Sequence, residues 1–196
     1  MKTRKPNIGI DSVISRDSVL FFDMDGTLVD TNYANFLSYK KAFELIKEVD
    51  FNTTYSPVCR FNRTALKKAI PELTETELKM IIQEKEKCYN DFLSETRINC
   101  KIAGVLLKYF KTNQTVLVTN CRRDRALATL NYHGLTDKFS KLFFREFDNN
   151  SVVNKFQNAI SILGVSPESI IAFENEGNEI ADAMKAGIQH INPIIL

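Results

Sequence analysis

The sequence predicts an α/β fold, in which a mainly parallel sheet of about five strands carries a helical segment inserted after its first strand. Short apolar runs rich in Val, Ile, Leu and Phe recur along the chain, separated by about 10 to 15 residues of helical pattern, which is the spacing of βαβ units. Between the first and second of these runs lie about 70 residues of helical pattern without a convincing strand. Two acids directly follow the first apolar run, at the edge where open α/β sheets bind ligands.

The apolar run 19–22 is typical of a buried parallel strand, and Asp23 and Asp25 stand at its carboxyl end. Residues two apart point the same way in extended backbone, so both carboxylates are expected to face one small volume. A divalent cation would relieve their repulsion, and Mg²⁺ typically binds one or two carboxylates, waters and a substrate phosphate. Gly26 then allows a sharp turn, including one at positive φ. Plain turns and calcium loops share this pattern, but the following residues are apolar where a calcium loop should be polar.

Three helices are expected in the inserted segment, because apolar residues recur there with the period of an α-helix. Pro71 ends the second helix, since proline cannot continue a helix interior, and Thr74 with a glutamate three residues later offers a capping start for the third. The expected helical domain covers residues 31–98, and residues 1–30 and 99–196 are expected to form the sheet-containing core. The three expected helices span residues 32–49, 63–70 and 74–93.

Beyond the insertion, helices and strands are expected to alternate to the end of the chain. Gly134, Gly164 and Gly187 each follow a helical pattern, as glycine often does where a helix ends. This alternation predicts mainly parallel pairing of the strands. The expected helices span residues 102–110, 123–133, 155–163 and 177–186, and the expected strands span 115–119, 141–145, 170–173 and 188–191.

Two further polar motifs are expected at the carboxyl ends of core strands. Thr119 and Asn120 end one strand, where a hydroxyl can donate to a phosphoryl oxygen and backbone N–H groups near a helix start favour an anion. The alternative is an ordinary helix cap, since threonine is common there. Glu174 and Asn175 follow a later strand, where oxygen ligands could complete a metal shell begun by the first two acids.

Four motifs resemble signatures of the haloacid dehalogenase-like phosphotransferase superfamily. Residues 23–31, DMDGTLVDT, are similar to the first signature, and Thr119 with Asn120 matches the second. Lys155 matches the phosphate-binding lysine of the third, although the Lys-Pro-x-Pro-Asp string of many members is absent and a lone lysine is usually a solvated surface charge. Residues 173–180, FENEGNEI, are similar to the fourth signature, Glu-Asp-Ser-x-x-Gly-Ile.

Asn175 stands where the fourth signature usually has a metal-binding aspartate. An asparagine keeps an oxygen ligand but removes a charge, so weakened magnesium affinity is expected. Glu174 could compensate as a direct ligand, and Glu179 matches a second acid found in other family members. Arg63 is similar in position to a cap arginine of β-phosphoglucomutase-like members that meets an anionic substrate group, although an arginine on a helix is mostly solvated.

The resemblance implies a Rossmann-like sheet with a small helical cap, of the β-phosphoglucomutase and phosphoglycolate phosphatase type. It implies a magnesium-dependent phosphatase that hydrolyses a small phosphorylated metabolite through an aspartyl-phosphate intermediate. The implied catalytic residues are Asp23 as nucleophile, Asp25 as acid and base, and Thr119 and Lys155 as groups that stabilise the phosphoryl oxygens. The implied metal ligands are Asp23, Asp25, Glu174 and Asn175, and the implied substrate-binding residues are Gly26, Thr27, Asn120 and Arg63.

Three other functions stay open from the sequence. A phosphosugar mutase of the β-phosphoglucomutase type carries a histidine in the first cap helix, and Asn35 stands in its place, which favours a hydrolase. A dehalogenase would need neither a metal nor Asp25, so two retained acids count against it. A binding protein of the same fold could have lost activity because Asn175 weakens its metal site.

Composition argues against several other classes of protein. The 26 basic and 24 acidic residues leave a net charge of +2 without a compact basic run, which argues against a nucleic-acid partner. No apolar segment approaches the ~20 residues of a membrane span, and residues 1–17 lack the apolar stretch of a signal peptide, so a cytoplasmic protein is expected. The four cysteines have no Cys-x-x-Cys spacing and lie far from both histidines in sequence, which favours free thiols over a zinc site or disulfides.

Overall fold

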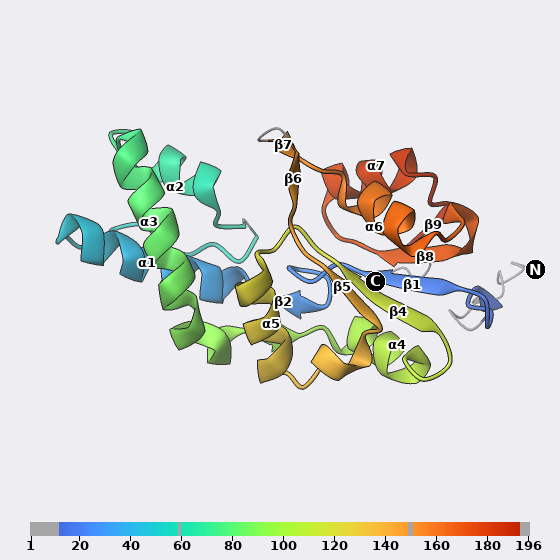
Figure 1. Cartoon of the computed structure of the whole chain (residues 1–196). Helices are drawn as coiled ribbons and strands as arrows, with labels where there is room; N and C mark the ends of the chain where they lie inside the picture. Colours follow the sequence, from blue (N-terminus) through green and yellow to red (C-terminus); the bar gives the residue numbers. More distant parts are fainter. Residues whose placement is uncertain (1–11, 59, 149–150, 193–196) are drawn as a thin grey trace, which may run out of the picture.

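A computed structural model of the protein describes residues 12–58, 60–148 and 151–192. Its centre is a parallel five-stranded sheet, as predicted (Figure 1). The central strand is bordered on both sides by strands that occur much later in the chain, which is the topology of βαβ crossovers. In spatial order the strands are β5 (Lys141–Phe143), β4 (Gln114–Val118), β1 (Val19–Phe22), β8 (Ile170–Phe173) and β9 (His190–Ile191).

Helices cover both faces of this sheet (Figure 1). On one face lie α4 (Cys100–Tyr109) and α5 (Arg123–Tyr132), and on the other lie α6 (Lys155–Leu163) and α7 (Gly177–Lys185). These helices fall where the apolar periodicity predicted them. Helices α4, α5 and α7 each lie between strands that are neighbours in the sheet, whereas α6 crosses from the edge strand β5 to β8. Both faces of the sheet are therefore buried, which explains why its strands are continuous apolar runs in the sequence.

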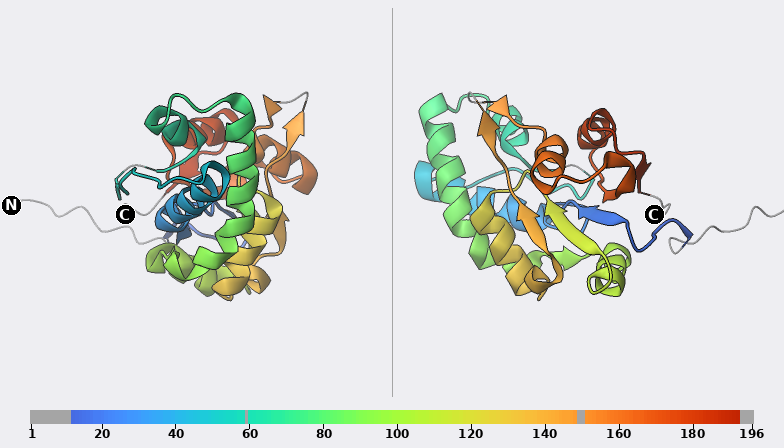
Figure 2. Two further views of the ribbon diagram at one scale, coloured as in Figure 1. Left: turned by 90° about the vertical axis from the view of Figure 1, so that its left-hand side faces the viewer. Right: turned by 45° about the vertical axis from the view of Figure 1, so that its right-hand side comes forward.

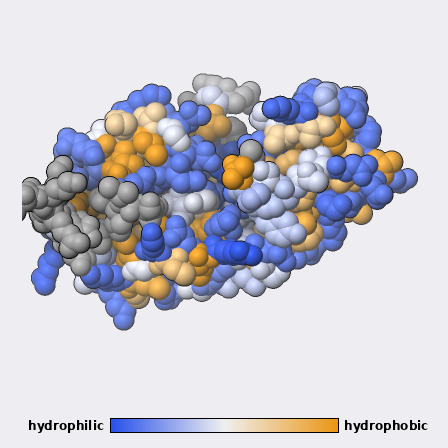
Figure 3. Space-filling view, turned by 180° about the vertical axis from the view of Figure 1, so that it is seen from behind, coloured by the Kyte–Doolittle hydropathy of each residue, from blue (hydrophilic) through white to orange (hydrophobic). Residues whose placement is uncertain are grey.

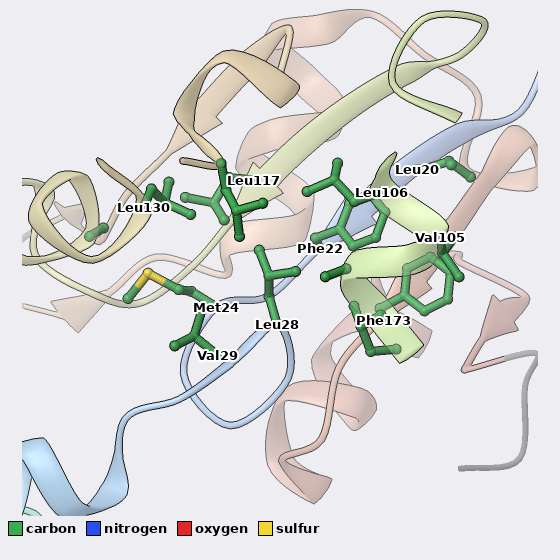
Figure 4. Close-up of a cluster of buried hydrophobic side chains, with 14 of the residues drawn as sticks. Leu20, Phe22, Met24, Leu28, Val29, Val105, Leu106, Leu117, Leu130 and Phe173 are labelled. Atoms are coloured by element: carbon green, nitrogen blue, oxygen red, sulfur yellow. The ribbon is translucent and has the colours of Figure 1, made fainter. Parts of the chain in front are cut away.

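Alternate side chains of β1 enter two separate hydrophobic clusters. Leu20 and Phe22 pack with residues of α4 and α5, in the cluster drawn in Figure 4. Val19 and Phe21 pack on the opposite face with residues of α6 and α7. All four are at most 6% exposed. The position of β1 is therefore set from both faces, and with it the position of the acids that follow.

The inserted helical segment leaves and rejoins the core through two short antiparallel strands. These are β2 (Val29–Asp30) and β3 (Arg97–Ile98), which pair with each other. The double connection brings both ends of the segment to one point of the core. Figures 1 and 2 show its helices gathered at one end of the molecule. They are α1 (Asn32–Lys47), α2 (Arg63–Ala69), α3 (Glu75–Cys88) and the 3₁₀ helix η2 (Tyr89–Glu95).

This segment has its own hydrophobic core, rich in aromatic side chains. The ring of Phe36 lies 6.0 Å from that of Phe51 and 5.4 Å from that of Phe61. Leu78 and Ile81 of α3 are buried against this cluster. Aromatic pairs at such distances add to the stability that burial alone provides. The inserted segment therefore does not depend on the two clusters of the sheet for its packing.

Some elements differ from the sequence prediction. The third helix of the insertion ends at Cys88, because the chain tightens there into η2. An antiparallel hairpin, β6 (Phe147–Asp148) with β7 (Ser151–Val152), was not predicted, since two-residue strands leave no detectable alternation. The described cysteines have free thiols, as predicted: they are Cys88, Cys100 and Cys121. Cys59 and residues 1–11 lie outside the described residues.

The surface is mixed in character. Figure 3 shows a face in which hydrophilic residues surround separate apolar patches. Ile162 and Met184 are examples of apolar side chains that are more than half exposed. Across the ranges of the chain that the structure describes, no helix has the length and apolar character needed to cross a membrane.

Candidate active site

The candidate site lies at the carboxyl edge of the sheet, where β1, β4 and β8 end side by side. Phe22 pairs with Leu117 of β4 and with Phe173 of β8. The residues that follow these strands therefore emerge close together, and they line one cavity of about 800 Å³ with side chains of α1, α3 and the loop before α2. Asp23 follows β1, Thr119 follows β4 and Glu174 follows β8.

Lys155 lies at the centre of an acidic cluster in this cavity. Its Nζ is 2.8 Å from Asp23 Oδ1, 2.7 Å from Glu174 Oε2 and 3.3 Å from Glu179 Oε2. The lysine reaches this point because it opens α6, which is capped by the side chain of Asn154. The residue with the weakest sequence signal is therefore in direct contact with the first acid.

Burial and charge oppose each other within this cluster. Burial raises the pKa of Asp23 to about 7; Lys155 acts against this rise, while Glu174 and Asp25 add to it. Burial alone would lower the pKa of Lys155, but the surrounding carboxylates raise it above its usual value. The lysine therefore stays charged among three acids, and the cluster keeps an excess of negative groups.

Asp25 has a different set of partners. Its Oδ1 accepts a hydrogen bond of 2.6 Å from Thr31 Oγ1. Arg125 of α5 lies along both carboxylate oxygens, with Nη1 3.5 Å from Oδ1 and Nη2 3.3 Å from Oδ2. Arg60, in the loop before α2, lies 3.5 Å from Oδ2 and also 3.0 Å from Glu176. The two acids therefore line the same cavity, as expected, but they contact different cations.

These cations decide the ionisation of Asp25. Burial alone would raise the pKa of Asp25, but Arg125, Arg60 and the hydrogen bond from Thr31 hold it below its usual value. The carboxylate is thus ionised at neutral pH in this arrangement. In that form it can accept a proton.

The chain reverses direction at Gly26, immediately after the second acid. The Gly26 N–H donates to the Val29 carbonyl at 2.8 Å, and the φ of Gly26 is 88°. The Thr27 hydroxyl donates to Asn175 Oδ1 at 2.9 Å. Gly26 and Thr27 therefore belong to a turn beside the acids, and Asn175 contacts this turn from the segment after β8. All three residues lie outside the lining of the cavity.

We expect Gly26→Ala to lower the free energy of unfolding by about 1–2 kcal/mol, because alanine is strained at positive φ. The new Cβ would also lie 2.6 Å from Asn175 Nδ2, which forces that amide to move. Gly104→Ala is the matched control: Gly104 lies in α4 with no atom within 4 Å of an added Cβ, so the change should stabilise by roughly 0.4–1 kcal/mol. Urea unfolding measures the free energy of unfolding of both variants. Equal changes in Gly26→Ala and Gly104→Ala would contradict the turn assigned at Gly26.

Thr119 and Asn120 occupy the edge next to the acids. Thr119 is buried, and its Oγ1 accepts a hydrogen bond from the backbone N–H of Cys121 at 3.1 Å. A hydroxyl that accepts in this way can still donate its own proton. Asn120 Nδ2 donates to Glu179 Oε1 at 2.7 Å, while its buried Oδ1 has no hydrogen-bond partner among the described residues. Both residues therefore keep polar capacity beside the cavity.

The inserted helices add a buried lysine to the opposite wall. Lys85 of α3 is 3% exposed, lies 3.3 Å from Glu86 and has its Nζ 5.1 Å from the centre of the Tyr89 ring. Burial, followed by the charge of Arg125, lowers the pKa of Lys85 to about 8. The cavity thus has positive groups on both its sheet side and its helical side.

Arg63 lies at the rim of the cavity. Its side chain is 60% exposed and its Nη2 is 3.7 Å from Glu75. Arg60, three residues earlier, is the arginine of this loop that reaches Asp25. A substrate-binding role for Arg63 therefore stays a prediction.

Sequence reasoning did not single out Arg125, although it contacts Asp25 directly. The available signal was its place on the helix that begins just after Thr119 and Asn120. A residue near the start of that helix stays near the carboxyl edge of the sheet. Arginine is nevertheless so common on helix surfaces that the pattern alone did not distinguish Arg125 from Arg122 and Arg123.

The donors on one side of the site fit a magnesium ion in their chemistry. Asp23 and Glu174 offer carboxylate oxygens and Asn175 an amide oxygen, which are the hard donors that Mg²⁺ prefers. In the described residues these donors are bonded to other side chains, and no group of three or more His, Cys, Asp or Glu side chains is already arranged to hold a metal. The Asp25 carboxylate, also expected as a ligand, is in contact with Arg125, Arg60 and Thr31 instead.

Fold and site together define an α/β protein with its ligand site at the carboxyl edge of a parallel sheet, beside an inserted helical segment. The sequence model of the family described as haloacid dehalogenase-like hydrolase matches residues 20–192. The chain therefore belongs to the haloacid dehalogenase-like hydrolase family, as its motifs predicted. No curated protein sequence matches it.

Solved structures of similar fold include CbbY from Rhodobacter sphaeroides in complex with phosphate, with a TM-score of 0.72 at 14% identity over 91% of this chain and 87% of that chain. A predicted phosphoglycolate phosphatase from Haemophilus somnus has a TM-score of 0.69 at 18% identity, and the match covers 92% of this chain and 90% of that chain. A haloacid dehalogenase-like family hydrolase from Streptococcus pneumoniae has a TM-score of 0.68 at 17% identity, and the match covers 90% of this chain and 84% of that chain. Identities this low show a shared fold.

Proposed function

We propose that the protein is a magnesium-dependent phosphatase that hydrolyses a small phosphorylated metabolite. The observation that carries the proposal is the contact of the Lys155 ammonium with Asp23 at 2.8 Å, at the sheet edge where Thr119 also emerges. A carboxylate nucleophile, a cation and a hydroxyl in one place suit phosphoryl transfer, because positioning and electrostatics supply most of its rate. Membership of a hydrolase family supports the same function.

In the proposed first half-reaction, a carboxylate oxygen of Asp23 attacks the phosphorus in line with the ester oxygen. The bond from phosphorus to the ester oxygen breaks. Asp25, which is ionised in the arrangement described above, takes up a proton before this step and gives it to that oxygen, which leaves as an alcohol. Asp23 is left as an acyl phosphate. Lys155 and Thr119 stabilise the negative charge on the phosphoryl oxygens.

In the second half-reaction, water attacks the phosphorus of phosphorylated Asp23, and Asp25 takes the proton that the water loses. The bond from phosphorus to the Asp23 oxygen breaks, inorganic phosphate leaves, and Asp25 is again a protonated carboxyl. This step needs Asp25 as an ionised base, the form that Arg125 favours.

Asp23, Glu174 and Asn175 are the residues proposed to hold Mg²⁺, with Asp25 as a further predicted ligand. When bound, the ion would act as a Lewis acid toward the phosphoryl oxygens and help to orient them. The neutral Asn175 in place of a charged ligand gives a site of modest affinity.

Asn175→Asp is expected to tighten Mg²⁺ binding by about tenfold, because it adds a charged oxygen ligand without changing side-chain size. Asn178→Asp, on an exposed residue of α7, is the matched control for added charge and should change the affinity little. Isothermal titration with MgCl₂ measures both variants. Equal affinities in the two variants would place Asn175 away from the metal.

Residues 31–98 are proposed to act as a cap domain on a core of residues 1–30 and 99–196. The position of the cavity between the two parts supports this division, as does Arg60, which connects the insertion to Asp25. Opening of a cap would admit substrate, and its closure would exclude bulk water during the reaction. The proposed substrate-binding residues are Gly26, Thr27, Asn120 and Arg63.

Hydrolysis is preferred to the mutase alternative because of Asn35. Its amide is bonded to Thr31 and Arg125, and an amide cannot exchange a proton at neutral pH as a histidine can. A screen of phosphorylated metabolites for phosphate release, with p-nitrophenyl phosphate as a general substrate, tests the proposal. We expect release that EDTA stops and Mg²⁺ restores. Isomerisation of a substrate without net release of phosphate would indicate a mutase. Binding of beryllium fluoride without any turnover would indicate a binding protein.

A further inference from the structure

Asp25 is held by two neighbours, Thr31 and Arg125, that form and break no bond in the half-reactions proposed above. The Thr31 hydroxyl donates to Oδ1 at 2.6 Å, and the guanidinium of Arg125 lies along both oxygens at 3.5 and 3.3 Å. Two guanidinium nitrogens facing one carboxylate fix its plane as well as its position. The side chains of Arg125 and Asp25 are only 11% and 5% exposed, so water competes little for these contacts.

Asn35 of α1 holds both of these neighbours. Its Oδ1 accepts a hydrogen bond from Arg125 Nη1 at 3.1 Å, and its Nδ2 donates to the carbonyl and the hydroxyl of Thr31 at 3.0 and 3.2 Å. Glu86 of α3 lies 3.6 Å from Arg125 Nε, and the guanidinium carbon lies 5.3 Å from the centre of the Tyr89 ring. The arginine is therefore fixed by groups from the inserted segment while it faces an acid of the core.

We propose that Arg125, held by Asn35, is a positioning residue for Asp25 during hydrolysis of phosphorylated Asp23; this inference rests on the proposed function. In that step the water oxygen bonds to phosphorus, the bond from phosphorus to Asp23 breaks, and the proton of the water goes to Asp25. The base must present one oxygen to the water, and a small misplacement of such a group is costly. Arg125 supplies the alignment, and Asn35 makes that alignment depend on the inserted segment being in place.

This role predicts a defect in one half-reaction only. p-Nitrophenolate is a weak base that leaves without a proton, so phosphorylation of Asp23 by p-nitrophenyl phosphate makes little demand on Asp25. Hydrolysis of phosphorylated Asp23 does require the base. Misalignment of Asp25 should therefore make phosphorylated enzyme accumulate during turnover, whereas general damage to the fold would slow turnover without such accumulation.

The test compares Arg125→Lys with Arg123→Lys during turnover of p-nitrophenyl phosphate. Lysine keeps the charge but cannot span both carboxylate oxygens. Arg123 lies on the same helix, is exposed and has its guanidinium over the Phe144 ring, which makes it a matched control. We expect Arg125→Lys to slow turnover roughly 10- to 100-fold, with phosphorylated protein as the major species in intact-mass spectra of quenched samples. Arg123→Lys should behave as the wild type.

Two further variants make the result specific. Asn35→Ala leaves Arg125 in place and should cause a smaller accumulation of phosphorylated protein. If Arg125→Lys does not fold, Asn35→Ala alone tests the positioning role. Adding Arg125→Lys to Asp25→Asn should slow turnover no further, because both act in one step. Normal turnover in Arg125→Lys, or slow turnover without accumulation, would overturn the role and leave the phosphatase proposal standing. Absence of hydrolysis by the wild type would instead refute the phosphatase proposal.

Discussion

Asp23→Asn is expected to abolish hydrolysis of p-nitrophenyl phosphate, with a fall in kcat of roughly 10⁴-fold or more. The amide oxygen is a poor nucleophile and cannot form the acyl phosphate on which both half-reactions depend. The substitution preserves the size of the side chain. Lys155 keeps its contact with Glu174 at 2.7 Å, so we expect the variant to fold. Phosphate release at saturating Mg²⁺ measures the loss, and intact-mass spectrometry should detect no phosphorylated protein.

The same substitution at Asp17 provides the control. Asp17 is exposed just before β1, so Asp17→Asn repeats the chemical change close in sequence but away from the cavity. Its activity should equal that of the wild type. If Asp23→Asn retained a substantial part of the activity, the nucleophile would have to be another residue and the mechanism proposed for this cavity would be wrong.

The sequence predicted the elements of the core well because each has a strong local signal. The apolar run of β1 is buried on both faces, and Gly164 ends α6 in the left-handed conformation that only glycine adopts readily. Thr74 starts α3 with the predicted capping box. The hairpin of β6 and β7 was missed because its strands are too short to show a period.

The inner face of α1 was predicted only in part, because tertiary contacts decide which apolar residues are covered. Phe36 and Phe43 enter the aromatic core, as their spacing predicted. Leu45 belongs to the same apolar pattern but is 55% exposed. Val49 lies beyond the helix, since Glu48 takes positive φ and ends it. A periodic pattern identifies a helix, but the surrounding elements determine the width of its buried stripe.

The positions of the two acids show where local reasoning ends. Alternation in an extended strand predicted that Asp23 and Asp25 would face one volume, and both do line the cavity. Their partners could not be predicted in the same way. Lys155 lies 132 residues after Asp23 in the chain, and Arg125 lies 100 residues after Asp25. Only the order of strands in the sheet brings each cation next to its acid. Long-range ion pairs leave no periodic trace in a sequence.

Lys155→Met is expected to lower both stability and activity strongly. The buried carboxylates of Asp23 and Glu174 would lose the cation that lies between them, and an uncompensated buried charge costs about 3–5 kcal/mol. Loss of one preorganised group that stabilises the phosphoryl oxygens should also reduce kcat by roughly 10²- to 10³-fold. Urea unfolding measures the first effect and phosphate release the second. Lys87→Met, at a side chain that is 72% exposed and paired only with Glu84 among the described residues, should change the unfolding free energy by at most about 0.5 kcal/mol.

A double variant separates the two effects of Lys155. Glu174→Gln removes one of the carboxylates that Lys155 neutralises, so in the Lys155→Met background it should recover part of the lost unfolding free energy. It restores no cation beside the phosphoryl group and also alters a proposed Mg²⁺ ligand, so activity should not rise above that of the single variant. If the double variant recovered activity together with stability, Lys155 would serve only to stabilise the fold. If Lys155→Met alone were as stable as the wild type, Lys155 and the acids would not be paired in solution.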